Sequence, residues 1–338
     1  MLRLYKPLKD HEIFKLHTML EHLVCSVWCE ACNDDCSTKL NKDFKDIYDS
    51  YDWLKTEVDA IYELCKKLKP EEKQDIKDAF VLNNEIEKLC NGESVPKYLD
   101  ELPDVVKDKM KPLLVDFYET LLERKKVPGT KQDYYQKLID ENDLKYCPCC
   151  GLSYFESEDS KYREAFDHYL PKAHYPFLSV NFKNLVPLCH KCNSDRKCDK
   201  DPIENNKTAF YPFSNANSHT IQISLIIDKT KDLRKLERQD LQINLIGDSA
   251  KIETWDRLFD VKERYNDTTR GFLKDHLKKI KRRHKIFTEN KNDWTYSNTL
   301  DELITDYEND KYEDFKFLRI PLMEELKNCS QLIDVYGN

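Results

Sequence analysis

The sequence predicts an α+β protein that is mostly helical and has three parts. Apolar residues recur at helical spacing along much of the chain. Glycine is rare, with 6 residues in 338, while Lys, Glu, Asp, Asn and Leu are abundant, and this composition favours helices over sandwiches or barrels. Two runs rich in β-branched residues, 221–228 and 241–247, are interpreted as a pair of strands.

Composition excludes several classes of protein. With 40% hydrophobic and 35% charged residues, the chain can build a core and is not disordered throughout. It has no run of eighteen apolar residues that would predict a transmembrane helix. The N-terminus is charged throughout and carries no secretory signal, so we expect a cytoplasmic protein. Thirteen cysteines, an odd number, rule out a complete set of intramolecular disulfides and favour metal ligands or buried thiols.

Residues 1–145 are predicted to form a helical domain for regulation or partner docking. Three apolar stripes at helical spacing begin near Ile13, Ile47 and Val105. Prolines fall between these stripes or near their starts, and Gly129 follows the third, as expected of helix boundaries. This part carries a net charge of −7.

Residues 146–200 are predicted to form a small unit stapled by a metal ion. Six cysteines lie there, five of them in two tight groups, with short apolar runs and several aromatic residues between the groups. The net charge of this unit is +1.

Residues 201–338 are predicted to form an α+β extension with a net charge of −2. It begins with a linker rich in Asn, which is followed by the strand pair. Helical patterns then run from about Ile252 past Lys285, and a last helix covers about 300–326, with a break expected near Pro321.

The cysteine groups contain two Cys-x-x-Cys pairs. At this spacing a tight turn lets two thiolates hold one face of a zinc tetrahedron, so two pairs predict a structural Cys₄ zinc site. The alternatives are buried free thiols and a redox pair, but no thioredoxin-like pattern surrounds either pair. The predicted zinc ligands are Cys147, Cys150, Cys189 and Cys192.

Polar residues between and after these pairs complete a motif. Asp167 and His168 follow a short aromatic run, Asn184 precedes the second pair, and Asn193 follows it directly. Over residues 146–198 this order resembles the HNH endonucleases, whose fold is the ββα-metal unit. Each residue taken alone would be read as a surface pair or a turn residue; the combination inside a Cys₄ frame favours the nuclease.

The resemblance implies a role for each of these residues. His168 would be the general base, and Asp167 and Asn193 would be oxygen ligands of a catalytic Mg²⁺ or Mn²⁺. Asn184 would hold the loop that carries His168. The third position of the family's motif is most often histidine. Asn193 therefore departs from the pattern, and a carboxamide oxygen there should shift the preference toward Mg²⁺ or Mn²⁺.

Basic residues nearby are candidate substrate contacts. Lys172, Arg196 and Lys197 flank the motif and would bind phosphate. The stretch 274–285 holds seven Lys or Arg and one Asp and continues a helical pattern. It would lie along a phosphate backbone or form the solvated face of an amphipathic helix, and the sequence does not separate these readings.

A second cysteine pattern lies in the N-terminal part. Its members are spaced 4, 3 and 4 residues apart and would share one stripe of a helix. An unbroken helix would hold the first and last about 16 Å apart, too far for one zinc ion to bind all four. We interpret them mainly as small core residues. They are Cys25, Cys29, Cys32 and Cys36.

The leading functional prediction is a metal-dependent endonuclease with DNA as the favoured substrate. HNH proteins with long flanking regions resemble subunits of bacterial anti-phage defence systems of the Septu type, which implies an ATPase partner. One alternative is a ribonuclease acting on an RNA such as tRNA. The other is a zinc-bearing binding module without catalysis. The net charge of −8 lies mainly outside the metal unit, so it argues against tight nonspecific binding by the isolated chain rather than against a nuclease.

Overall fold

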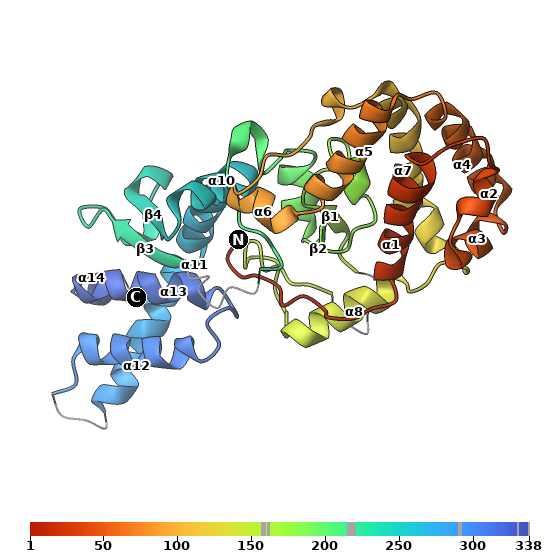
Figure 1. The fold of residues 1–338 in the computed structure, drawn as a ribbon. Coiled ribbons are helices and arrows are strands. Elements are labelled where there is room, and N and C mark those ends of the chain that lie inside the picture. The colour runs from red at the N-terminus through yellow and green to blue at the C-terminus, as the bar shows by residue number, and fades with distance from the viewer. Residues whose placement is uncertain (157–159, 161–162, 215–220, 290–292, 330, 337–338) are drawn as a thin grey trace. The chain divides into compact units, whose positions relative to one another are not determined.

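A computed structural model describes residues 1–156, 160, 163–214, 221–289, 293–329 and 331–336. The chain forms two compact units, each built from more than one segment (Figure 1). The larger unit comprises Arg3–Leu144 and Phe155–Asn217. The smaller unit comprises Met1–Leu2, Lys145–Tyr154 and Ser218–Asn338. This grouping differs from the predicted three-part division, because residues 155–200 belong with the N-terminal helices.

The larger unit is mostly helical and contains one short hairpin. Its α-helices and strands are α1 Phe14–His22, α2 Cys36–Lys39, α3 Lys42–Tyr48, α4 Asp52–Cys65, α5 Pro70–Asn83, α6 Ile86–Asn91, α7 Lys111–Glu119, α8 Lys131–Asn142, β1 Phe166–His168, β2 Leu185–Pro187 and α9 His190–Cys192. Short 3₁₀ or π-helical turns are η1 Leu23–Trp28, η2 Leu99–Glu101, η3 Val106–Met110, η4 Leu121–Glu123, η5 Pro176–Leu178, η6 Asn193–Lys197 and η7 Glu204–Asn206.

Local sequence signals set several helix ends in this unit. The Asn41 side chain accepts a hydrogen bond from the Phe44 amide and caps α3, and the Thr130 side chain does the same for α8. Pro70 occupies the first turn of α5, where a missing N–H costs nothing. The prediction of a helical N-terminal part is confirmed at the level of its elements.

The β1–β2 hairpin is antiparallel, with Asp167 opposite Val186, and helices of the same unit surround it (Figure 1). All six strand residues are buried. Two three-residue strands cannot bury their own faces, so the hairpin depends on its neighbours. An aromatic cluster supplies this cover: the Tyr134 ring of α8 lies 5.8 Å from the Phe166 ring and 4.7 Å from the Phe182 ring.

The smaller unit packs helices against a second hairpin. Strands β3 Gln222–Ile227 and β4 Leu241–Ile246 pair antiparallel, with Leu225 opposite Ile243, which confirms the predicted strand pair. The helices are α10 Ser249–Phe259, α11 Val261–Thr288, α12 Tyr296–Glu308, α13 Lys316–Lys327 and α14 Gln331–Tyr336, with 3₁₀ turns η8 Leu233–Lys235 and η9 Arg238–Asp240.

The predicted break near Pro321 is wrong, because Pro321 lies inside α13. The helical pattern breaks instead between α12 and α13, where Asp314 and Phe315 adopt positive φ angles of 47° and 59°. These two left-handed residues directly precede α13, whereas α12 has already ended at Glu308.

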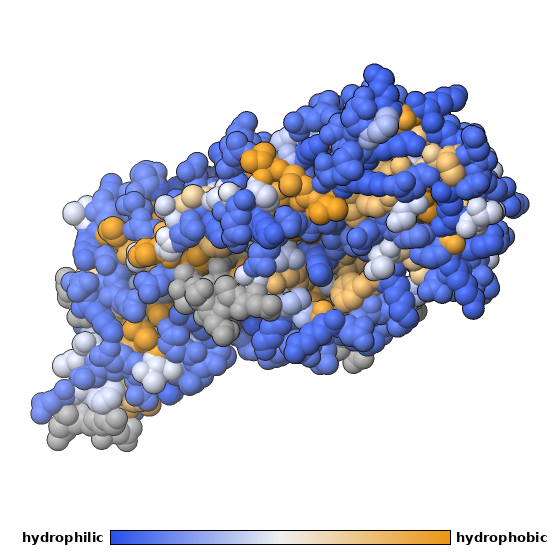
Figure 2. Space-filling view, in the orientation of Figure 1, coloured by the Kyte–Doolittle hydropathy of each residue, from blue (hydrophilic) through white to orange (hydrophobic). Residues whose placement is uncertain are grey.

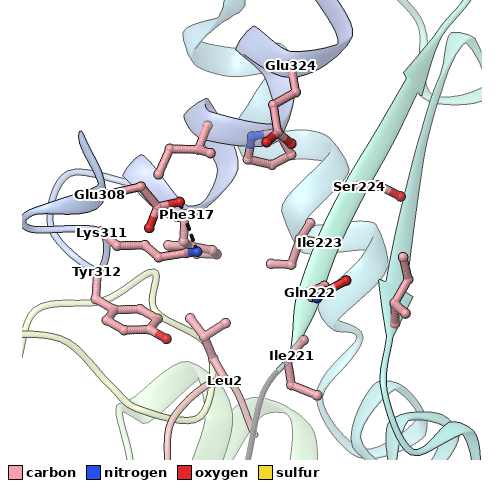
Figure 3. Close-up of a pocket in the computed structure, with 13 residues that line it drawn as sticks. Leu2, Ile221, Gln222, Ile223, Ser224, Glu308, Lys311, Tyr312, Phe317 and Glu324 are labelled. Carbon is pink, nitrogen blue, oxygen red and sulfur yellow. Dashed lines mark hydrogen bonds and ion pairs between the residues drawn. The ribbon is translucent and has the colours of Figure 1, made fainter. Parts of the chain in front are cut away.

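The smaller unit also holds a pocket of about 350 Å³ between β3 and the α12–α13 region (Figure 3). Ile221 and Ile223 line the strand side, and Lys311, on the opposite side, pairs with Glu308 at 3.2 Å. None of the predicted catalytic residues lines this pocket.

The face seen in Figure 2 is largely hydrophilic, with apolar residues in small groups. Among the residues that the structure describes, no helix combines the length and the apolarity needed to cross a bilayer.

Candidate functional site

Asp167 and His168 occupy adjacent positions at the end of β1, and both are buried, with 4% and 9% of their surface exposed. Successive residues of a strand point to opposite sides. Accordingly, the Asp167 carboxylate meets the turn η6, whereas the His168 ring meets η5 and α7. The hairpin therefore presents an acid and an imidazole in two different directions.

The ring of His168 is held in one tautomer. Its Nε2 lies 2.9 Å from the carbonyl oxygen of Ser179, which can only accept a hydrogen bond. Nε2 therefore carries the ring proton, and Nδ1 keeps a free lone pair. Burial, followed by the nearby charges of Lys172 and Lys197, lowers the pKa of His168 to about 3, so the ring is neutral near pH 7.

The Asp167 carboxylate pairs with a buried lysine. The Lys197 ammonium lies 3.1 Å from Asp167 Oδ1 and 3.0 Å from Oδ2, and it also donates to the His168 carbonyl at 2.9 Å. The Lys197 side chain is fully buried. Burial raises the pKa of Asp167, and the Lys197 charge opposes this rise. The pair compensates a carboxylate that would otherwise be buried alone.

Asn184 is fully buried and binds the segment that follows His168. Its Oδ1 accepts from the Leu170 amide at 2.8 Å, and its Nδ2 donates to the Leu170 carbonyl at 2.9 Å. Its own carbonyl accepts from the Tyr169 amide at 2.9 Å. These three bonds fix the backbone after β1, which is the geometry expected of a residue that holds the loop carrying the base.

Asn193 is half-buried and begins η6, a π-helical turn that starts directly after α9. Single π-helical turns are rare in proteins as a whole, and those that occur often lie at functional sites. The chain thus runs strand, strand, helical turn from β1 to η6. This is the order that the ββα resemblance implies.

Of the predicted phosphate contacts, two lie near the surface and one does not. Lys172 is partly exposed and pairs with Glu119 at 2.6 Å. Arg196 is half-buried in η6 and donates to the Lys191 carbonyl at 3.3 Å. Lys197, by contrast, is an interior partner of Asp167 rather than a surface cation.

Two neighbours of His168 escape sequence reasoning. The Tyr118 ring of α7 lies 4.5 Å from the His168 ring in an edge-on arrangement. Lys131 of α8 stacks over that tyrosine at 4.3 Å, and Lys172 lies 5.1 Å from the same ring. Both new residues come from helices far from the motif in sequence, and no local spacing signals them. Burial first, and then the charges of Lys172, Lys197 and Lys131, lower the pKa of His168.

The oxygen donors of this site suit a hard divalent cation. Asp167 Oδ2 lies close to Lys197 but makes no well-aligned hydrogen bond, so a buried carboxylate lone pair stays open. A carboxylate and a carboxamide are ligands typical of Mg²⁺ or Mn²⁺. The Asp167 carboxylate could contribute to the binding of such an ion if the ion shared it with Lys197.

Four cysteines gather into a second candidate metal centre. All four are buried and free of disulfides, and their sulfur atoms lie within 4.8 Å of one another. Tetrahedral zinc with Zn–S bonds of about 2.3 Å places its sulfurs about 3.8 Å apart, so this set could hold one zinc ion. They are the four predicted ligands Cys147, Cys150, Cys189 and Cys192.

The turn of the first cysteine pair has the backbone of a zinc knuckle. The Gly151 amide donates to the Cys147 carbonyl at 2.7 Å, and the Leu152 amide points at the Cys150 sulfur at 3.4 Å. Gly151 has a φ of +68°, and a Cβ there would meet Leu2 at 2.5 Å. Only glycine fits this turn without strain.

The N-terminal cysteine pattern does not form a helix stripe. The turn η1 ends at Trp28, and Cys36 begins the separate helix α2, so the assumption of an unbroken helix is wrong. Cys29 and Cys36 are buried, whereas Cys32 is exposed. Among the described residues these cysteines do not belong to a metal-binding group.

Comparison with known proteins finds two partial relatives. The chain is similar to the Septu protein PtuB of Bacillus thuringiensis, with 32% identity over 142 residues, or 38% of this chain and 50% of that protein. It is also similar to protein ea31 of Escherichia phage lambda, with 34% identity over 109 residues, or 32% of this chain and 33% of that protein. The chain thus spans about half and one third of the lengths of these curated relatives. No protein-family model matches the chain, and no solved structure matches it significantly.

Proposed function

We propose that this protein is a metal-dependent HNH-type endonuclease that hydrolyses nucleic-acid phosphodiesters, with DNA as the favoured substrate. The arrangement of His168 carries the proposal: a neutral imidazole, fixed in one tautomer beside a buried carboxylate, on a hairpin that leads into a Cys-x-x-Cys-Asn turn. The similarity to a protein named for the Septu system supports a role in defence against phages beside an ATPase partner.

His168 acts as the general base in this proposal. The Ser179 carbonyl fixes the hydrogen on Nε2, so Nδ1 can accept a proton from the attacking water. Burial keeps the free ring neutral, and the negative charge of a bound phosphodiester favours the protonated ring once the water is deprotonated. The edge-on Tyr118 ring limits rotation of the imidazole.

Asp167 and Asn193 would hold the catalytic cation. Bound there, a divalent ion supplies charge neutralisation at the phosphate and at the leaving oxygen. Lys197 holds the Asp167 carboxylate in place, and Asn184 holds the backbone on the other side of His168. Lys131 and Lys172 pair with Glu123 and Glu119, and a bound phosphodiester would compete with these glutamates for the two ammonium groups.

The first test compares wild type with His168→Ala on plasmid DNA, single-stranded DNA and tRNA in Mg²⁺. We expect cleavage of DNA by wild type and a loss of at least 100-fold in the variant, because general bases contribute about 10²–10⁴ in rate. His174→Ala is the matched control, since His174 is an exposed histidine six residues away. Cleavage of tRNA alone would favour the ribonuclease alternative. If wild type and His168→Ala gave the same result on every substrate, the enzyme proposal would fail and the alternative of a zinc-bearing binding module would remain.

The second test addresses the metal. Cleavage should be supported by Mg²⁺ or Mn²⁺, because Asp167 and Asn193 offer only oxygen ligands. Stronger cleavage with Ni²⁺ or Zn²⁺ would contradict this assignment. Asp167→Asn should abolish cleavage while the Cys₄ zinc content stays unchanged.

The defence role is tested in cells that carry the gene at its natural locus. We expect His168→Ala to raise the plating efficiency of phages to the level of a gene deletion, whereas His174→Ala should protect like wild type. If the His168→Ala strain were fully protected against phages, the defence role would not depend on the proposed nuclease activity.

A further inference from the structure

The second half of α11 carries a row of cations along one face. Lys274, Lys278, Arg282 and Lys285 are all exposed, whereas His276, Leu277 and Ile280 on the other side of the helix are buried. At 100° per residue the four cations fall within an 80° sector. We call them the basic stripe. Along the axis it extends about 17 Å, from the first cation to the last.

The cations of the basic stripe are not neutralised by the protein. None of the four makes an ion pair or a hydrogen bond through its side chain within the described part of the chain. Other cations on the same helix are occupied: Lys279 donates to the Tyr307 hydroxyl at 2.8 Å, and Arg270 pairs with Asp267 at 2.5 Å. The stretch 274–285 contains one acid, the exposed Asp275, at the edge of the sector.

The surface beside the start of the stripe is open. Gly271 lies one turn before Lys274 in the same sector, and a Cβ placed on it would meet nothing within 4 Å. The aromatic rings near the C-terminal end of α11 pack against neighbouring side chains: Phe287 lies 5.0 Å from Arg283 and 5.2 Å from the Trp294 ring, and Tyr296 stacks on His284. A ligand that contacts the start of the stripe therefore meets flexible cations and, at Gly271, bare backbone.

We propose that the basic stripe binds the phosphate backbone of duplex DNA. The proposal rests on the nuclease function proposed above and names a surface that holds the substrate. Charge complementarity selects the occupant, because a duplex carries about one negative charge per 1.7 Å of its axis and offers several phosphates to a row of this length. Contacts from cations to phosphates carry no sequence information, so we expect binding without base preference.

The test uses the full chain with His168→Ala, so that binding is measured without cleavage. In the stripe variant, Lys274, Lys278, Arg282 and Lys285 are changed to Gln. All four are exposed, so the fold should be retained, and circular dichroism checks this. The control variant makes the same charge change at exposed lysines elsewhere, namely Lys67, Lys109, Lys231 and Lys235.

Fluorescence anisotropy with a labelled 30-base-pair duplex gives affinity as a function of salt. We expect the stripe variant to bind at least tenfold more weakly at 100 mM salt. We also expect a log–log salt slope that is shallower by about 3 to 4, since each lost phosphate contact removes about 0.9. The control variant should stay within twofold of its parent. Two duplexes of unrelated sequence should behave alike.

Several outcomes would overturn the proposal. They are unchanged affinity and slope in the stripe variant, an equal loss in the control variant, and binding of tRNA or anionic vesicles with no binding of duplex DNA. Failure of the nuclease proposal is recognised separately. If wild type cleaves no substrate while the stripe variant still binds DNA more weakly than its parent, that result supports the basic stripe as a DNA-binding surface and contradicts the catalytic assignment.

Discussion

The buried pair of Lys197 and Asp167 allows a stringent test of the site. Lys197→Met keeps the length of the side chain but removes the charge. The ammonium that touches both oxygens of Asp167 and the His168 carbonyl is then lost. Asp167 must either remain charged without a partner or take up a proton.

The loss of stability can be bounded. Breaking a buried ion pair by removing one partner typically costs about 3–5 kcal/mol. Protonation of Asp167 limits this cost, because neutralising a carboxyl group with an unfolded pKa of about 3.9 costs about 4 kcal/mol at pH 7 and about 1.5 kcal/mol at pH 5. We therefore expect Lys197→Met to lower the free energy of unfolding by about 4 kcal/mol at pH 7.

The same argument fixes the sign of the pH dependence. Burial already raises the pKa of Asp167, and loss of the Lys197 charge raises it further. Between the unfolded pKa and this raised value the native state binds more protons than the unfolded state, so stability falls as pH rises. The penalty of Lys197→Met should be smaller at pH 5 than at pH 7.

Urea unfolding followed by circular dichroism, without added divalent cation, gives the loss of unfolding free energy at pH 7 and at pH 5. Lys197→Met/Asp167→Asn should recover most of the loss and remove its pH dependence. Lys172→Met is the matched control, since Lys172 pairs with Glu119 near the surface and such pairs contribute about 0–1 kcal/mol. A loss below 1 kcal/mol at pH 7, or an equal loss at both pH values, would refute the reasoning.

Three further predictions concern other sites. Burial lowers the pKa of His276 to about 3, and within the described part of the chain neither ring nitrogen has a hydrogen-bond partner. Protonation of the unfolded chain below pH 6.5 should therefore destabilise the protein by about 2 kcal/mol at pH 5. The stability gained in His276→Phe should be about 2 kcal/mol larger at pH 5 than at pH 8 in urea titrations, and an equal gain at both pH values would contradict this. Metal analysis should find about one zinc ion per chain. The zinc should be lost in Cys189→Ser and kept in Cys198→Ser, which changes an exposed thiol. A wild-type protein that is folded without zinc would exclude the Cys₄ site. Asn184→Ala leaves the buried Leu170 amide and carbonyl without their side-chain partner. It should lower the free energy of unfolding by about 2–4 kcal/mol, measured by thermal or urea unfolding, and remove most of the cleavage activity. A loss of stability under about 0.5 kcal/mol would show that other contacts hold the loop.

Sequence reasoning works here where the chemistry is local. The hairpin and the turn after it lie within 32 residues of chain, from Phe166 to Lys197, and their order is what the resemblance to the HNH endonucleases implies. The four cysteines lie in two short pairs whose geometry the turn imposes, and the structure gathers the same four. The β3–β4 pair is likewise signalled by its own β-branched residues.

Sequence reasoning fails where a feature depends on distant packing. The α12–α13 break lies between Glu308 and Lys316 and finishes with two left-handed residues, Asp314 and Phe315, which no proline or glycine announces. The hairpin joins the N-terminal helices because Phe166 needs the Tyr134 ring to cover it. The contact of Tyr118 with His168 arises from the same packing, which spacing along the chain does not encode.

The charges of the candidate site explain why a weak nuclease is expected of the isolated chain. The structure pairs the Asp167 carboxylate with Lys197 and the Lys172 ammonium with Glu119, so the two groups to which the proposed function assigns cation and phosphate binding are occupied by the protein itself. Substrate and metal must compete with these internal partners, and the chain as a whole repels polyanions with its net charge of −8. Binding energy supplied from outside the site, by the basic stripe or by a partner protein, would offset both costs. Cleavage should therefore depend steeply on salt and increase when a partner holds the DNA.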